Sequence, residues 1–290
     1  MADKIWRPSS ADANVAGNYL PSGVPATNDT IYFTDEAAFP MTTNISAAFA
    51  TKTLALVFEK GFAHYAGSSG LPMTCATWSQ IIFEANTTFP SFFTSTTATT
   101  KVCINTQSQL DNICEFNGSI GRVSLLSGRV GLNAAATVTN RIGIKAINGA
   151  AQPKLTIPAG VTLTGIELAM NGGEVMCSAA IPKVKVENGQ FTLAGSVGIS
   201  GFVEMYGGVF YWDAADQASP SVIALAEVYG GTFKTRLNRL GRTLTEGNCF
   251  GDGMFDFSIG GLNITFTNPI RAYGSNPPRY QVGASYAKGV

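Results

Sequence analysis

The chain has 290 residues, of which 13% are charged and 45% hydrophobic, with 19 basic and 19 acidic side chains. A typical soluble domain has about 25% charged residues, so Gly, Ser, Thr and Asn replace much of the charge here. The balanced charge and the lack of a long basic run argue against nucleic-acid binding. An aromatic fraction of 10% argues against disorder. A chain of such low net charge suits a subunit packed among others.

The amino terminus, MADKIWRPSS, has no apolar core of signal-peptide length, and no run of about eighteen apolar residues occurs anywhere. We therefore expect neither a secretory signal nor a membrane span. The five cysteines are odd in number and lack zinc spacing, which predicts reduced, partly buried thiols in a protein made in a cytoplasm. Cys103 and Cys114 are near enough in sequence to pair across a hairpin, and the sequence alone does not decide this.

Residues 5–33 contain a recognisable order of motifs. Trp6 is followed by a loop with Asn18-Tyr19, then by Gly23-Val24-Pro25, then by the strand-like residues 29–33, DTIYF. This order resembles the amino-terminal module of many bacterial and phage β-helical surface proteins, although those more often have Trp after the Asn. Residues 52–73 resemble the next coil of such proteins. The resemblance covers about the first quarter of the chain, and it implies that residues 1–50 form an irregular amino-terminal arm or cap on a β-helix.

Residues 84–100, EANTTFPSFFTSTTATT, combine a Thr-rich composition with Phe89, Phe92 and Phe93. A solvated loop would not carry three phenylalanines. They either fill one end of the fold or contact a neighbouring molecule, and the sequence leaves both alternatives open.

Residues 51–265 contain a degenerate repeat with a period of about twenty residues, typical of stacked supersecondary units. Each copy reads aliphatic, polar or Tyr, small turn residue, Gly, any residue, apolar, and its glycine supplies a positive φ at a corner. The copies are centred on Gly128, Gly149, Gly173, Gly189, Gly208, Gly231 and Gly261.

One such corner cannot bury its own apolar flanks, so the copies must stack with Met205, Val228, Phe210 and Phe233 pointing inward. The pattern predicts an all-β, single-stranded parallel β-helix (β-solenoid) over residues 51–265. An antiparallel sandwich with Gly-rich hairpins is the alternative, but it would not align the inward residues so consistently.

Carboxylates are the main candidates for chemistry. Glu204 and Glu227 occupy the same repeat position, so on adjacent coils they would lie about 5 Å apart, and glycoside hydrolysis uses two such groups. Lys185 aligns with Glu204 and would compensate its charge, and Trp212 is the best aromatic platform for a sugar. A solvated charge ladder is therefore favoured over catalysis. The other acidic candidates are Asp213 and Asp216, in an insertion at residues 211–221, and Asp252 and Asp256.

The remaining polar motifs are weaker. The single histidine, His64, lies beside no nucleophile elbow, and Gly-Asp-Gly at 251–253 lacks the acidic run that a hard cation requires. We expect no catalytic residue, no cofactor and no metal. The basic cluster is either a solvated edge, which we favour, or a contact for an acidic partner; it comprises Lys234, Arg236, Arg239 and Arg242.

Residues 266–290 contain a Pro pair and scattered Gly, so we expect an extended carboxy-terminal tail that neighbouring subunits hold. The resemblance and the lack of an export signal imply a bacteriophage virion protein made in the host cytoplasm. We expect a capsid decoration (cement) protein on the capsid surface, forming a homotrimer and binding the major capsid protein, with no nucleic-acid or membrane partner and no enzymatic activity. The alternatives are a tailspike or fibre that binds or cleaves host polysaccharide, and a bacterial adhesin passenger.

Overall fold

The computed structural model describes residues 1–147, 150–195, 197–213, 220–236, 241–259, 264–273 and 279–282. The chain divides into two compact units, residues 1–156 (unit 1) and 157–290 (unit 2). Both are built from parallel strands, and the fold is an all-β parallel β-solenoid of about 11 turns with almost no helix among the described residues. The predicted fold class is confirmed, and the antiparallel sandwich is wrong.

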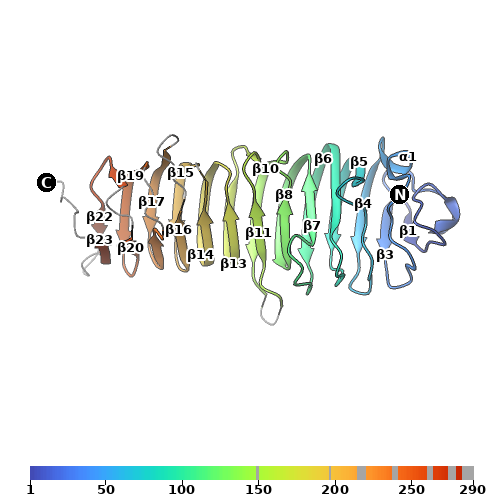
Figure 1. Ribbon diagram of the computed structural model, residues 1–290, viewed down its shortest axis with the longest axis horizontal. Helices are drawn as coiled ribbons and strands as arrows, with labels where there is room; N and C mark the ends of the chain where they lie inside the picture. Colours follow the sequence, from blue (N-terminus) through green and yellow to red (C-terminus); the bar gives the residue numbers. More distant parts are fainter. Residues whose placement is uncertain are drawn as a thin grey trace. The chain divides into compact units, whose positions relative to one another are not determined.

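The strands of each unit follow one another in chain order (Figure 1). The elements of unit 1 are β1 (Asp3–Trp6), η1 (Ala16–Asn18), β2 (Tyr19–Leu20), β3 (Thr30–Phe33), α1 (Ile45–Phe49), β4 (Thr53–Phe58), β5 (Met73–Phe83), β6 (Ser91–Asn105), β7 (Cys114–Asn117), β8 (Ser119–Ser127), β9 (Arg129–Leu132), β10 (Thr137–Lys145) and β11 (Lys154–Ile157).

The elements of unit 2 within its described residues are β12 (Thr162–Leu163), β13 (Glu167–Cys177), β14 (Ile181–Leu193), β15 (Ile199–Met205), β16 (Val209–Trp212), β17 (Ser221–Val228), β18 (Thr232–Lys234), β19 (Arg242–Phe250), β20 (Met254–Phe257), β21 (Ile264–Phe266), β22 (Arg271–Tyr273) and β23 (Arg279–Val282).

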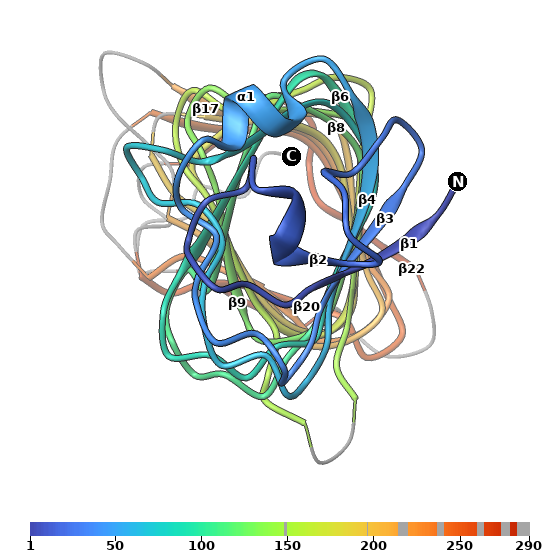
Figure 2. The same ribbon diagram turned by 90° about the vertical axis from the view of Figure 1, so that its right-hand side faces the viewer.

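The parallel ladder of unit 1 starts inside the amino-terminal segment. β1 pairs with β3, β3 with β4, and β4 with β5, all in parallel. The strands on either side of residue 50, the expected end of the arm, therefore belong to one continuous ladder. The short β2 pairs antiparallel with β1. Figure 2 shows η1 and β2 lying inside the outline traced by the coils of unit 1.

The motifs behind the family resemblance build this cap. Asn18 is fully buried, and its side chain bonds the loop at residues 9–12: it accepts a hydrogen bond from the Ser9 amide at 3.0 Å and donates to the Asp12 carbonyl at 2.8 Å. The rings of Tyr19 and Trp6 meet edge to face at 5.2 Å, and both are buried. The Asn-aromatic pair thus closes the first coil over the apolar interior.

The interior of unit 1 contains a cluster of phenylalanines. Phe93, from the Thr-rich segment, is buried and packs against Phe58 at 5.6 Å and Phe116 at 5.2 Å between ring centroids. Its strand β6 pairs with β5 on one side and with β7 and β8 on the other. Both expectations for residues 84–100 are therefore wrong for Phe93, which lies in the middle of a unit. Phe89 is half exposed and lies beside Tyr65.

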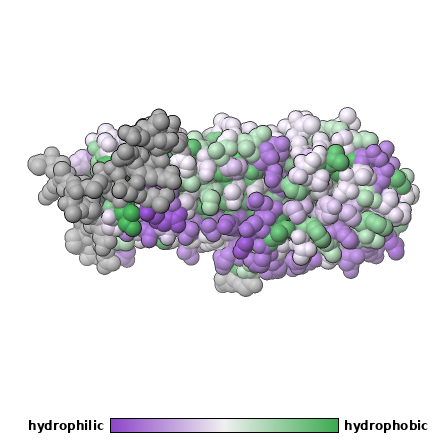
Figure 3. Space-filling view, viewed as in Figure 1, coloured by the Kyte–Doolittle hydropathy of each residue, from purple (hydrophilic) through white to green (hydrophobic). Residues whose placement is uncertain are grey.

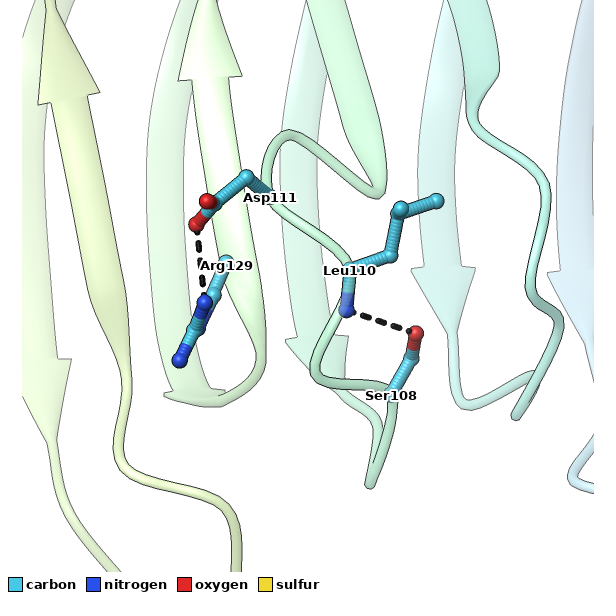
Figure 4. A network of polar contacts seen from close by, with 4 residues as sticks. All are labelled: Ser108, Leu110, Asp111 and Arg129. Atoms are coloured by element: carbon cyan, nitrogen blue, oxygen red, sulfur yellow. Dashed lines mark hydrogen bonds and ion pairs between the residues drawn. The ribbon is translucent and has the colours of Figure 1, made fainter.

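The loop between β6 and β7 is tied to its neighbours by polar side chains. The Ser108 hydroxyl accepts a hydrogen bond from the Leu110 amide, and Arg129 forms a 3.0 Å ion pair with Asp111 (Figure 4). Ser108 also donates to the Thr87 carbonyl on the preceding turn. The bond from Ser108 to Thr87 and the Arg129–Asp111 ion pair thus connect this loop to neighbouring turns, as the ladders connect successive strands.

The predicted corners are present in unit 2. Gly189, Gly208 and Gly231 have φ values of +95°, +71° and +76°. A Cβ at Gly208 would lie 2.4 Å from the Gly189 carbonyl oxygen, and one at Gly231 would lie 2.4 Å from that of Gly208. Each corner therefore needs glycine both for its backbone conformation and for contact with the preceding turn. Gly128 and Gly173 also have positive φ, whereas Gly149 and Gly261 lie outside the described residues.

The inward positions flanking these corners form columns. Met205, Val228, Phe210 and Phe233 are all fully buried, as predicted. Phe210 stacks on Phe191 at 5.1 Å and on Phe233 at 4.7 Å, with interplanar angles of 15° and 6°.

In the expected tail, β22 pairs in parallel with β19 and β23 with β20.

Candidate functional site

The in-register Glu204 and Glu227 mark the candidate site on the outer face of unit 2. They are ladder partners on β15 and β17, as the repeat predicted. Lys185 precedes them in the row and Asn248 follows, each in register with its neighbour. Successive strands lie about 4.8 Å apart, so the two carboxylates are on adjacent rungs.

Tyrosine hydroxyls, rather than cations, contact both carboxylates. Tyr206 donates to Glu204 at 3.4 Å and Tyr229 to Glu227 at 3.2 Å. Partial desolvation and the Glu227 charge raise the pKa of the Tyr229 hydroxyl. Lys185 pairs instead with its strand neighbour Glu187 at 3.5 Å and lies 4.9 Å from the centre of the Tyr206 ring. The expected compensation of Glu204 by Lys185 is therefore not a direct ion pair.

A second row, of aromatic side chains, runs beside the carboxylates. Tyr206, Tyr229, Phe250 and Tyr273 stack face to face at 5.0, 4.5 and 4.8 Å on successive turns. Tyr206 is 48% exposed and Tyr273 46%. Because each ring covers the face of the next, the row presents ring edges to solvent. A sugar that stacks on a ring face would find those faces largely occupied.

A shallow groove lies near the start of the same strands. It has a volume of about 460 Å³ and is lined mainly by apolar side chains, among them Ile181, Pro182, Ile199 and Val222. Phe202 and Leu225, both half-buried, lie one outward position before Glu204 and Glu227. Groove, apolar row, carboxylate row and aromatic row thus succeed one another along these strands.

The other carboxylate candidates are separate from this row. Asp213 is buried and forms a 2.5 Å ion pair with Arg236, whose guanidinium lies 3.8 Å from the centre of the Tyr211 ring. The hydrogen bond from Arg236 to Asp213 raises the pKa of the guanidinium. Asp256 accepts hydrogen bonds from Ser258. Asp213 and Asp256 therefore have structural roles, and Asp216 lies outside the described residues.

Two expectations about this region are wrong. Trp212 is fully buried and donates to the Ser221 hydroxyl at 2.8 Å, so it is no sugar platform. Arg242 is 1% exposed and lies 6.0 Å from the Trp212 ring, so it is not part of a solvated edge. Arg239 lies outside the described residues.

The cysteines are free thiols, and four of the five are buried. The predicted burial of the thiols is confirmed, and the alternative Cys103–Cys114 pair is wrong. Cys114 faces the interior of β7, whereas Cys103 lies half-buried on the outer face of β6. Burial raises the pKa of Cys75 to about 11 and that of Cys177 to about 12, which keeps both thiols protonated.

Unit 1 contains a charged row that the sequence reading missed. Lys101 on β6 is in register with Arg122 on β8, and Arg122 with Arg141 on β10. All three side chains are exposed. Their near-regular spacing in the sequence could have predicted the row, but no glycine corner lies beside these residues to align them with the repeat.

Comparisons of the chain with known protein families, curated proteins and solved structures give no match. The resemblance of residues 5–33 to β-helical surface proteins stays a prediction.

In its described residues the chain has no helix with the length and apolar character of a membrane span. The same residues contain no group of three or more His, Cys, Asp or Glu placed to hold a metal. On the face drawn in Figure 3, hydrophilic and hydrophobic residues are interspersed over its described part.

Proposed function

We propose that the chain is a structural protein of a bacteriophage particle, a capsid decoration (cement) protein that bridges neighbouring capsid subunits. The stacked interior of unit 2 carries the proposal. Phe191, Phe210 and Phe233 repeat the same ring on three successive turns in nearly parallel planes. Such columns, combined with glycine corners that admit no side chain, make a stiff scaffold whose outer rows hold a fixed spacing.

A stiff scaffold suits a protein that works by binding at several points at once. Many weak contacts at fixed spacing stabilise a lattice through multivalency and mass action. A homotrimer that contacts the major capsid protein would multiply such contacts. We propose no catalytic activity, because the tyrosine hydroxyls occupy Glu204 and Glu227 and the neighbouring ring faces are stacked.

Electron microscopy of the native particle tests this proposal. We expect density for the chain on the outer capsid surface, and we expect particles that lack it to lose their genome at lower temperature or ionic strength. Density on the tail, or unchanged particle stability without the chain, would contradict the proposed role.

Polysaccharide binding is the second candidate, and the outer face of unit 2 favours it. The apolar groove, the Glu204–Glu227 pair and the aromatic edges adjoin on the same strands. Binding of host surface polysaccharide should then weaken in the double variant E204Q/E227Q and persist in the matched control E36Q/E59Q in unit 1. Cleavage of the polysaccharide by the wild type, lost in E204Q/E227Q, would instead indicate a glycosidase.

A further inference from the structure

Each unit contains a row of like charges on adjacent rungs. In unit 1 the row is Lys101 and Arg122, and in unit 2 it is Glu204 and Glu227. We call these the cation ladder and the carboxylate ladder. Like charges directly opposite each other on neighbouring strands are destabilising. Both ladders therefore favour a partner of opposite charge.

Neither ladder is neutralised by salt bridges within the described chain. Lys101 and Arg122 are exposed and form none with a described residue. The described cations likewise form none with Glu204 or Glu227, whose hydrogen bonds come from tyrosine hydroxyls. Lys185, the nearest cation in the row, is paired with Glu187.

The two ladders match each other in sign and in spacing. Both are set by the distance between parallel strands, about 4.8 Å per rung. We propose that the cation ladder of one copy of this chain binds the carboxylate ladder of a second copy. Successive rungs then form successive ion pairs, with no change of backbone in either unit.

Apolar side chains beside each ladder supply contact area. Ile82 and Cys103 are half-buried on the outer face next to the cation ladder, and Phe202 and Leu225 next to the carboxylate ladder. Exposed ion pairs contribute only about 0–1 kcal/mol each. Apolar contact, chiefly from Phe202 and Leu225, therefore adds to the affinity, and the ladders fix the register and the choice of partner.

A second copy is favoured over another partner because one chain carries both ladders and has a net charge of zero. An anionic polymer would neutralise the cation ladder but leave the mutual repulsion of the two carboxylates. A metal ion would neutralise the carboxylates but leave the mutual repulsion of the two cations. Association with further copies of the chain neutralises both ladders, since each copy offers one ladder of either sign to its neighbours. This inference does not depend on the proposed role in a phage particle.

Sedimentation of the purified full-length chain tests the proposal by charge reversal. We expect the wild type to self-associate at about 20 mM salt and to dissociate at about 500 mM, where exposed charges are screened. K101E/R122E and E204K/E227K should each raise the dissociation constant by about tenfold or more, because repulsive contacts replace attractive ones.

The decisive samples combine the reversals. An equimolar mixture of K101E/R122E and E204K/E227K should associate again, and so should a single chain that carries all four substitutions. Matched controls place equal charge changes elsewhere: K60E/K234E and E36K/E59K should behave as wild type. Circular dichroism checks that each variant is folded.

Three outcomes would overturn the proposal. The first is a wild type that stays monomeric at about 100 µM and low salt, where electrostatic attraction is least screened. The second is self-association that is indifferent to either reversal. The third is failure of the mixed and fourfold-reversed samples to associate when the variants are folded.

Discussion

The two units reach the same coiled architecture with different interiors. In unit 2 the rings of Phe191, Phe210 and Phe233 lie within 15° of parallel, like on like. In unit 1 the Phe58 ring stacks on Phe33 at 11°, but it meets Phe62 at 55° and Phe93 at 69°. A parallel ladder therefore requires only that inward positions be apolar. Columns of identical residues on successive turns are not required for the ladder, and unit 2 contains more of them than unit 1.

The difference shows what fixes each unit. Unit 2 depends on corners where glycine touches glycine, so its turns constrain one another closely. Unit 1 depends more on its cap and on a phenylalanine cluster whose members pack at varied angles. Damage at a corner should therefore affect unit 2 most, and damage at the cap should be confined to unit 1.

The largest effect is expected from Gly208→Val. The backbone has φ of +71°, and a Cβ would lie 2.4 Å from the Gly189 carbonyl oxygen. The left-handed conformation alone costs a side-chain-bearing residue about 1–2 kcal/mol. With the clash added, unit 2 should lose more than about 4 kcal/mol of unfolding free energy, a loss seen only for severe defects. Urea denaturation followed by circular dichroism measures it.

Gly70→Ala is the control, since a Cβ there meets nothing within 4 Å. Its urea midpoint should equal that of the wild type. Equal midpoints for Gly208→Val and Gly70→Ala would show that the stacked corners do not limit stability.

Phe210→Ala should have the next largest effect. Removing a fully buried phenylalanine lowers stability by about 3–5 kcal/mol, and here it also breaks two stacked contacts. A double-mutant cycle with Phe191→Ala should show a coupling energy of about 1 kcal/mol. The matched cycle in unit 1 is Phe58 with Phe83, whose rings meet at 39°. A larger coupling in unit 1 than in unit 2 would contradict the contrast between the two interiors.

Asn18→Ala should destabilise the cap by about 2 kcal/mol, because the backbone groups that Asn18 bonds lose their buried partner. Hydrogen exchange should accelerate in β1 and β3 and stay unchanged in unit 2. Ser22→Ala is the control, since the exposed Ser22 hydroxyl makes a single bond to a carbonyl. Faster exchange throughout unit 2 would show that the cap supports more than unit 1.

The smallest effect concerns alkaline pH. Burial raises the pKa of Cys177 in unit 2 to about 12, so the folded state holds this proton longer than the unfolded state does. The resulting stability is complete below the ordinary thiol pKa of about 8.5 and is lost as the pH rises toward 12. Near pH 9 the loss should be about 1 kcal/mol, and it should disappear in Cys177→Ala.

Much of unit 2 could be predicted because its repeats preserve residue type. Corners such as Gly208 and Gly231, flanked by Phe210 and Phe233, mark both the turn and the inward column. In unit 1 the same coil is built from Trp6, Phe33 and Phe58, which share no local motif. A repeat search therefore detects unit 1 through the cap motif and the copies at Gly128 and Gly149, and it does not place Phe93 of the Thr-rich strand β6 in the interior.

The candidate site was only partly visible for a related reason. The register of Glu204 with Glu227 follows from the repeat. The burial of a side chain, in contrast, depends on the residues that surround it in the folded chain, which the repeat does not reveal. Trp212 and Arg242 look like surface residues in sequence, and both are buried beneath neighbouring turns. The cation ladder joins residues whose local contexts differ, so only the strand pairing brings Lys101 and Arg122 together.

The register at the glycine corners has a consequence for protein length. Val209 and Thr232 are partners on adjacent rungs, as are Phe210 and Phe233, so the chain after Gly208 is equivalent to the chain after Gly231. Excising residues 209–231 would join Gly208 directly to Thr232 and preserve the rows on either side. Stacked repeats interact mainly with their nearest neighbours. Unit 2 can therefore serve as a molecular ruler whose length evolution or design could reset one coil at a time.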